Sequence, residues 1–441
     1  MCGIIFTNKK INNLEYINFF CKRRGPDFTT EYKKNNFTFK NNLLQITGKI
    51  IKQPLIDEKN NIICIYNGEI YNYDKDKYDS DGQCIINFYK KYGNDFIRYL
   101  DGEFSICLVD FKKNILIFSS DVFSTKPLFY SIEKEYIGIS SYYSTLNKLK
   151  FKNIKKISAN CTLIYNLSNL KLKKKKTVYD FDLTQHKKNL NDIFDKLEKS
   201  VLKRSKNINK KIFLGLSSGY DSGCINCILN KYNIDHTIYS IQGSENIEIL
   251  KERHKLHKFN KEYIINNKKK FYYYQKYLKE NCEFFRYTKS KKWNTHNDPA
   301  ASGLALICDK AKNKNELIYI SGQGADEIIS DYSINGKNCG PSNSTCFNGK
   351  FPNDLNKIFP WKNFFGRMQT DYLMKEELVS GTFGIEGRYP YLDKDFVQEF
   401  LWLIPKLKNK DYKYILSEYM KKNNYPFYNK KKEGFRANWK I

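Results

Sequence analysis

The chain has 441 residues, of which 41% are hydrophobic and 16% aromatic, so it is long enough for two packed domains. It contains no apolar run of about 18 residues, which argues against a membrane-spanning helix. The net charge is +29, but the lysines are spread over the whole length instead of forming one basic stripe, which disfavours nucleic acid as a partner.

The first residues carry no charged-then-apolar leader, because the polar stretch KKINN follows almost at once. The twelve cysteines are scattered, as expected of reduced thiols. We therefore expect a cytoplasmic protein with small-molecule substrates and no membrane partner. A homodimer is left open.

The chain opens with MCGII, which places a cysteine directly after the initiator methionine. Chance is one explanation. The other is chemical: once the methionine is removed, Cys2 carries both a thiol and a free α-amine, whose unperturbed pKa is about 7.7–8.0. The amine can then act as the base for its own thiol, so Cys2 is a candidate nucleophile.

Further along the first half, an apolar run over residues 62–66 ends in Asn67 and Gly68. Asn-Gly is a turn signal, so a simple hairpin is one interpretation. The other is an oxyanion hole, because a side-chain amide and a backbone N–H are both donors for a developing negative charge. Asp81 stands near the start of a helix predicted over residues 79–93, where it could cap the helix or hold a substrate ammonium group.

From about residue 189 short apolar runs alternate with helical stretches, which is typical of a parallel α/β sheet. Residues 212–216 predict a buried strand, and the polar turn SSGYDS and a helix follow it. Backbone N–H groups in such a turn bind anions, although the serines and the aspartate could also be mere caps. The candidate ligand-binding residues here are Leu216, Ser217, Gly219, Asp221 and Ser222.

A second Gly-containing loop, SGQGADE, follows another predicted strand and carries Ser321, Gly322, Gln323 and Asp326. A third strand ends near Ile241. The carboxyl ends of parallel strands meet at one edge of a sheet, so both loops should lie there. Asp221 and Asp326 would then be hard oxygen ligands for Mg²⁺, with helix capping as the alternative for the second aspartate.

Six short motifs of the first half resemble, in order, the class II glutamine amidotransferase domain of asparagine synthetases: MCGI, RRGPD, YNGEIYN, SDGQ, LDGEFSICLVD and KPLFY. The resemblance implies an α+β N-terminal-nucleophile hydrolase domain, an αββα sandwich, over residues 2–165. It implies that Cys2 attacks the side-chain amide of glutamine. The implied glutamine-binding residues are Asn67, Gly68, Glu69 and Asp81, the first two as the oxyanion hole.

The second half resembles the ATP-pyrophosphatase-type domain of the same family. SSGYDS is similar to its pyrophosphate loop SGGxDS, SGQGADE to SGEGxDE, EGRYPYLD to ExRxPxLD, and KKKEGF to a late K-E-x-F block with the lysine at Lys432. The resemblance implies an adenine nucleotide α-hydrolase-like α/β domain over 189–441, after a linker over 166–188. It implies ATP and Mg²⁺ as cofactors, with Gln323 and Lys432 as catalytic residues and Lys413 as a second candidate for phosphate contact.

The chain departs from the family pattern at two positions. Leu43 stands where the family has an arginine for the α-carboxylate of glutamine, and leucine cannot make that bidentate contact. Gln323 replaces a glutamate and so lacks a charge and any base function.

Together the two halves imply a reaction that turns aspartate, glutamine and ATP into asparagine, glutamate, AMP and pyrophosphate. Two alternatives stay open, namely an amide ligase for another carboxylate acceptor and a binding protein without catalysis.

Overall fold

The computed structural model describes residues 2–206, 208–242, 245–265, 267–288, 292–334, 337–338, 345–347 and 349–427. The chain divides into two compact units. The first runs to Asp180 and also takes in Ser380–Glu386, and the second begins at Phe181. None of the described helices is long and apolar enough to cross a membrane.

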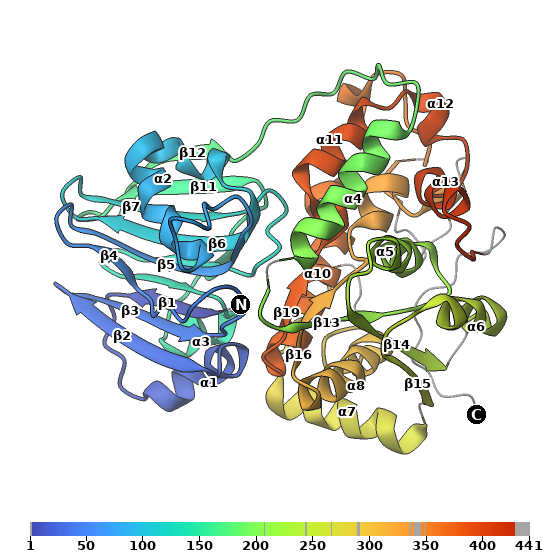
Figure 1. Ribbon diagram of the computed structural model, residues 1–441. Coiled ribbons are helices and arrows are strands. Elements are labelled where there is room, and N and C mark those ends of the chain that lie inside the picture. Colours follow the sequence, from blue (N-terminus) through green and yellow to red (C-terminus); the bar gives the residue numbers. More distant parts are fainter. Residues whose placement is uncertain are drawn as a thin grey trace. The chain divides into compact units, whose positions relative to one another are not determined.

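The first unit contains two six-stranded antiparallel sheets stacked on one another (Figure 1). One sheet has the order β10-β8-β9-β1-β3-β2 and the other β12-β11-β7-β6-β5-β4. Their strands are β1 Gly3–Thr7, β2 Phe28–Lys34, β3 Phe37–Leu43, β4 Leu55–Asp57, β5 Ile62–Ile70, β6 Gly102–Asp110, β7 Ile115–Ser120, β8 Phe129–Ile132, β9 Ile137–Ser140, β10 Lys155–Lys156, β11 Cys161–Asn166 and β12 Leu172–Thr177.

The core of the first unit lies between the two sheets. Alternate residues of each strand point inward, for example Ile4 and Phe6 of β1 and Ile63 and Ile65 of β5, and all four are buried. Helices cover the outer faces: α1 (Leu14–Arg24) and α3 (Tyr143–Lys148) lie beside one sheet, and α2 (Cys84–Tyr92) beside the other (Figure 1). The predicted αββα sandwich is confirmed.

The linker predicted over residues 166–188 is wrong in its first part. Residues 172–177 form strand β12, which pairs with β11 from Cys161 to Tyr165, and the first unit continues to Asp180. The sequence did not predict β12 because its lysine-rich stretch lacks apolar alternation and has the composition of a solvated linker. Lysine is also the residue with which proteins protect an exposed sheet edge.

The second unit is built on a five-stranded sheet of order β15-β14-β13-β16-β19. Its strands are β13 Lys211–Gly215, β14 His236–Gln242, β15 Lys261–Ile265, β16 Glu316–Ile320 and β19 Glu386–Arg388. The pairs β13–β14, β13–β16 and β14–β15 are parallel, which confirms the predicted parallel sheet. Because β13 and β16 are neighbours, the loops that follow them meet at one edge.

Helices surround this sheet. They are α4 Asn191–Ser205, α5 Tyr220–Lys231, α6 Ile247–Leu256, α7 Lys268–Asn281, α8 Pro299–Asn313, α9 Lys362–Phe365, α10 Met368–Thr382, α11 Lys394–Trp402, α12 Pro405–Lys408 and α13 Tyr414–Lys422. A short hairpin, β17 Ser333–Ile334 with β18 Lys337–Asn338, lies outside the main sheet.

A buried ion cluster joins α4 to α11. Asp393 caps α11 and accepts hydrogen bonds from the backbone N–H groups of Asp395 and Phe396. Its Oδ2 lies 2.6 Å from Lys203 Nζ and 2.9 Å from Arg204 Nη1. Burial alone would raise the pKa of Asp393, but the charges of Lys203 and Arg204 outweigh this effect and the pKa lies below its ordinary value.

We expect Asp393→Asn to lower the free energy of unfolding by about 3–5 kcal/mol near pH 7, because one partner of a buried ion cluster is removed. A carboxylate with a depressed pKa stabilises the fold above its unfolded pKa of about 3.9, and this contribution is lost as the pH falls. Urea unfolding from pH 7 down to about pH 2 should therefore show a difference from wild type that shrinks once the pH falls below about 4. Asp395→Asn in the same helix is the control, and a loss independent of pH would contradict the electrostatic explanation.

Candidate active sites

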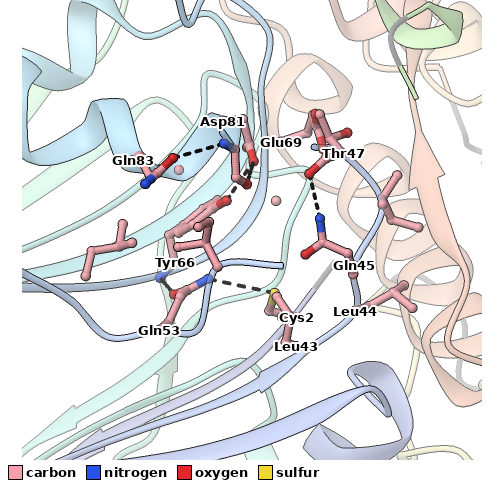
Figure 2. A pocket seen from close by; sticks show the side chains of 16 residues that line it. Cys2, Leu43, Leu44, Gln45, Thr47, Gln53, Tyr66, Glu69, Asp81 and Gln83 are labelled. Carbon is pink, nitrogen blue, oxygen red and sulfur yellow. Dashed lines mark hydrogen bonds between the residues drawn. The ribbon is translucent and has the colours of Figure 1, made fainter. Parts of the chain in front are cut away.

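A cavity of the first unit opens at the start of β1. Its lining includes Cys2, Gly68, Glu69 and Asp81, four of the residues predicted from the sequence (Figure 2). They come from three segments far apart in the chain: the N-terminus, strand β5 and the short helix Asp81–Gln83. The fold therefore brings the predicted residues together.

Cys2 makes hydrogen bonds through its backbone nitrogen, its carbonyl oxygen and its sulfur. Its backbone N–H donates to Asn67 Oδ1 at 2.7 Å, its carbonyl accepts from Arg24 Nε at 3.1 Å, and its Sγ accepts from Gln53 Nε2 at 3.9 Å. Gly3 lets β1 approach α1, because a Cβ there would lie 2.6 Å from the Cys21 carbonyl oxygen. The glycine of the MCGI motif is thus explained by this close approach.

Burial raises the pKa of the Cys2 thiol, although a hydrogen bond from the Leu44 backbone acts in the opposite direction. A thiol with a raised pKa is protonated at neutral pH, so it needs a base at the moment of attack. The α-amine on the same residue is the group that the sequence offers for this task.

Asn67 and Gly68 do not form a hairpin turn, because both lie inside β5 and pair with Ser105 and Phe104 of β6. Asn67 is fully buried and its Nδ2 has no hydrogen-bond partner among the residues that the structure describes. Gly68 has φ +138°, and a Cβ there would lie 2.0 Å from the Glu103 carbonyl oxygen. An unpartnered amide donor next to the nucleophile is what an oxyanion hole requires.

We expect Asn67→Ala to lower kcat for amide hydrolysis by about 10²–10³, the usual cost of one oxyanion donor. Asn67→Asp is the informative partner variant, because it keeps an acceptor for the Cys2 N–H and loses only the Nδ2 donor. Steady-state ammonia release should fall in both variants with little change in KM. A rise in KM at constant kcat would mean that Asn67 binds the ground state instead.

Asp81 is not the cap of its helix, since Ser80 occupies that position. Its carboxylate accepts hydrogen bonds from Tyr66 Oη at 2.9 Å, the Ile70 N–H at 2.9 Å and Ser80 Oγ at 3.1 Å. Burial raises the pKa of Asp81 despite these donors. The three contacts hold the carboxyl group rigidly in the cavity wall, beside the buried Glu69, as a site for an ammonium group needs.

The second candidate site lies at the carboxyl ends of β13 and β16. Within the first loop the Ser217 N–H donates to Ser222 Oγ at 3.0 Å. The two loops touch, because a Cβ on Gly322 would lie 2.9 Å from Asp221 Cβ. Glycine at position 322 thus permits the close approach of the second loop to the first.

Asp221 and Asp326 point toward a common centre, where the ammonium group of Lys413 lies. Lys413 Nζ is 2.6 and 2.7 Å from the two Asp221 oxygens and 2.8 Å from Asp326 Oδ1. Tyr412 Oη donates to the same Asp326 oxygen at 2.6 Å. Burial alone would lower the pKa of Lys413, but the charges of the two aspartates raise it above its ordinary value.

This arrangement fits a divalent cation. Two carboxylates that converge on one positive charge have the hard oxygen donors and the geometry that Mg²⁺ takes when phosphates complete its shell. No cluster of three or more His, Cys, Asp or Glu side chains able to hold a metal occurs in the described part of the chain.

Three further contacts of this site were not predicted. Glu245 Oε2 accepts hydrogen bonds from both the N–H and the Oγ of Ser218, each at 2.6 Å. A carboxylate of the protein itself therefore occupies two donors of the loop that follows β13. Ser321 Oγ donates to Glu376 Oε2 at 2.6 Å and accepts from the Gln323 N–H at 3.0 Å. Burial raises the pKa of Glu376 to about 7.

The remaining predicted residues are placed as follows. Leu216 and Ile241 are buried at strand ends, where Ser240 Oγ donates to the Leu216 carbonyl at 2.8 Å. Gly219 caps α5, and its N–H donates to Ser217 Oγ at 3.1 Å. Lys432 lies outside the described residues.

Two family models match the chain. Residues 1–181 match the glutamine amidotransferase domain and residues 360–441 match asparagine synthase. The chain thus carries a glutamine amidotransferase domain followed by an asparagine synthase domain, and it is similar to proteins named glutamine-hydrolysing asparagine synthetases.

Curated relatives agree over most of the chain. A Methanocaldococcus jannaschii protein that carries the name of a glutamine-hydrolysing asparagine synthetase is 26% identical over 82% of this chain and 68% of its own length. Asparagine synthetase 1 of Arabidopsis thaliana is 24% identical over 92% of this chain and 71% of its own. The Zea mays enzyme is 23% identical over 85% of this chain and 64% of its own.

Among solved structures, the glutamine phosphoribosylpyrophosphate amidotransferase of B. subtilis is 12% identical, with a TM-score of 0.34, over 48% of this chain and 60% of that one. The NMN synthetase of Francisella tularensis is 14% identical, with a TM-score of 0.23, over 32% of this chain and 58% of that one. The similarity of the chain to asparagine synthetases rests on the sequence matches.

Proposed function

We propose that the protein is a glutamine-hydrolysing asparagine synthase, which uses ATP to convert aspartate and glutamine to asparagine and glutamate, with AMP and pyrophosphate as further products. The observation that carries this proposal is the geometry at Cys2: a buried thiol whose own backbone nitrogen donates to Asn67, while the Asn67 amide donor lies unpartnered beside it. The two domain matches and the similarity to asparagine synthetases support the pairing of this site with the aspartate pair of the second unit.

In the first step the Cys2 sulfur attacks the amide carbon of glutamine, and the α-amine of the same residue takes the thiol proton. Asn67 Nδ2 and the Gly68 N–H donate to the oxyanion of the tetrahedral intermediate. The C–N bond then breaks, ammonia leaves with the transferred proton, and water hydrolyses the thioester to glutamate. Asp81 and Glu69 hold the ammonium group of the substrate.

In the second unit, Asp221 and Asp326 would hold Mg²⁺, which neutralises charge on the ATP phosphates when it is bound. The donors of the loop after β13 bind phosphate oxygens, and Lys413 supplies a further positive charge at the same place. Activation of the aspartate carboxylate as an acyl-adenylate releases pyrophosphate, and attack of ammonia on the acyl carbon releases AMP.

The test is pyrophosphate release by the full-length protein with Mg²⁺ and ATP. We expect release that depends on aspartate, with one asparagine formed per pyrophosphate, and nitrogen from either glutamine or ammonium. Release that depends on another carboxylate would favour a related amide ligase, a second candidate supported by Gln323 in place of a glutamate. Absence of release with every acceptor and both nitrogen sources would contradict the enzyme proposal.

A further inference from the structure

The cavity at Cys2 is unbalanced in charge. Two carboxylates, Glu69 and Asp81, line it, and among its described lining residues there is no lysine or arginine. Arg24 donates to the Cys2 carbonyl, but it is fully buried and does not line the cavity. A ligand with an ammonium group therefore finds partners here, and a ligand with a carboxylate finds no lysine or arginine side chain in the described lining.

The wall next to the nucleophile is apolar. Strands β1 and β3 are antiparallel, and Gly3 pairs with Asn42. The preceding residue, Cys2, therefore lies opposite Leu43, which is the last residue of β3. Leu43 is only 7% exposed, and Leu44 and Ile46 extend the same wall (Figure 2). A carboxylate placed against this wall would lose its hydration without gaining a charge partner, which is costly.

One neutral polar group in the lining is unused. Thr47 is 5% exposed, and its Oγ1 has no hydrogen-bond partner among the described residues. A hydroxyl donates one hydrogen bond and matches a carbonyl oxygen. The lining thus offers carboxylates for an ammonium group and a hydroxyl for a neutral carbonyl, and Asn67, hydrogen-bonded to Cys2, stands behind it for the amide under attack.

We infer that the cavity selects glutamine whose α-carboxyl group is neutral, as in an α-amide or a peptide bond, over free glutamine. This inference rests on the proposed role of Cys2 in amide hydrolysis and specifies its substrate. The reaction is unchanged: the C–N bond of the glutamine side-chain amide breaks, water supplies the new oxygen, and ammonia leaves. The selectivity arises because a neutral carbonyl needs only a neutral donor such as the Thr47 hydroxyl, whereas a carboxylate finds no lysine or arginine side chain among the described lining residues and an apolar wall at Leu43.

The experiment compares ammonia release by the full-length protein from L-glutamine and from L-glutamine α-N-methylamide, whose only source of ammonia is the side-chain amide. We expect kcat/KM to be at least tenfold higher for the methylamide, because free glutamine would have to bury a carboxylate that has no charged side chain as a partner in the lining. Equal or better use of free glutamine would overturn the inference and leave the glutaminase proposal intact. No ammonia from either substrate would overturn both.

Two variants sharpen the test. Leu43→Arg brings a cation to the wall and should reduce the preference for the methylamide at least tenfold, whereas Ile50→Arg adds the same charge at an exposed position outside the lining and should not. Thr47→Val replaces only the hydroxyl group by a methyl group. It therefore tests the inference even if Leu43→Arg disturbs folding. It should lower kcat/KM for the methylamide about tenfold and hardly affect free glutamine, and an equal fall for both substrates would overturn the assignment of Thr47.

Discussion

Cys2→Ala is expected to abolish ammonia release from glutamine, by at least about a thousandfold, while synthesis with ammonium continues. The thiol lies in the cavity lining next to the unpartnered Asn67 donor, and removal of a nucleophile usually costs more than removal of any supporting donor. Asn67 and Gly68 would then have no oxyanion to bind. The measurement is pyrophosphate release with glutamine and, separately, with ammonium.

The control for this variant is Cys346→Ser. Cys346 is partly exposed, whereas the other described cysteines are buried, so its replacement tests the loss of a thiol without touching the cavity. Loss of ammonium-dependent synthesis in Cys2→Ala would indicate that the substitution disturbs the fold. Retention of glutamine-dependent synthesis would contradict the role of Cys2 altogether.

Lys413→Ala is expected to destabilise the second unit by about 3–5 kcal/mol in the absence of divalent cations, because Asp221 and Asp326 then face each other without their cation. Mg²⁺ should restore much of this loss by taking the vacated position. The variant should therefore show a larger rise in Tm between EDTA and millimolar Mg²⁺ than wild type, in which the lysine already balances the charge.

Lys421→Ala is the matched control, since this lysine is exposed on α13. It should change neither the Tm nor the response to Mg²⁺. If Mg²⁺ stabilised Lys413→Ala no more than wild type, the two aspartates would not be a metal-binding pair. ATP-dependent pyrophosphate release should also fall in Lys413→Ala, because a positive charge is lost beside the phosphates.

The fold class could be predicted because local patterns and tertiary structure agree. Residues 212–216 form a continuous apolar run and become the buried strand β13 at the centre of the sheet. For Asn67 and Gly68 the local pattern and the tertiary structure disagree. The Asn-Gly sequence predicts a turn, and only the pairing with β6 shows that both residues lie within a strand. Local propensity is a weak guide where tertiary contacts dominate.

The candidate sites could be predicted as motifs but not as geometry. The sequence places Asp221 and Asp326 on two loops, and the parallel sheet brings them together. Nothing in the spacing indicates that Lys413, far along the sequence, balances both charges, or that Glu245 engages the Ser218 donors. Such contacts depend on which segments the sheet order makes neighbours.

The lysines of β12 also bear on assembly. They stand on the outermost strand of their sheet, and Lys173, Lys174 and Lys175 are exposed. If the β12 edge of a second molecule paired with this edge, the lysine ammonium groups of the two molecules would repel each other. Part of the large positive charge therefore acts as a barrier against fibril-like stacking, and any self-association must use another face of the protein.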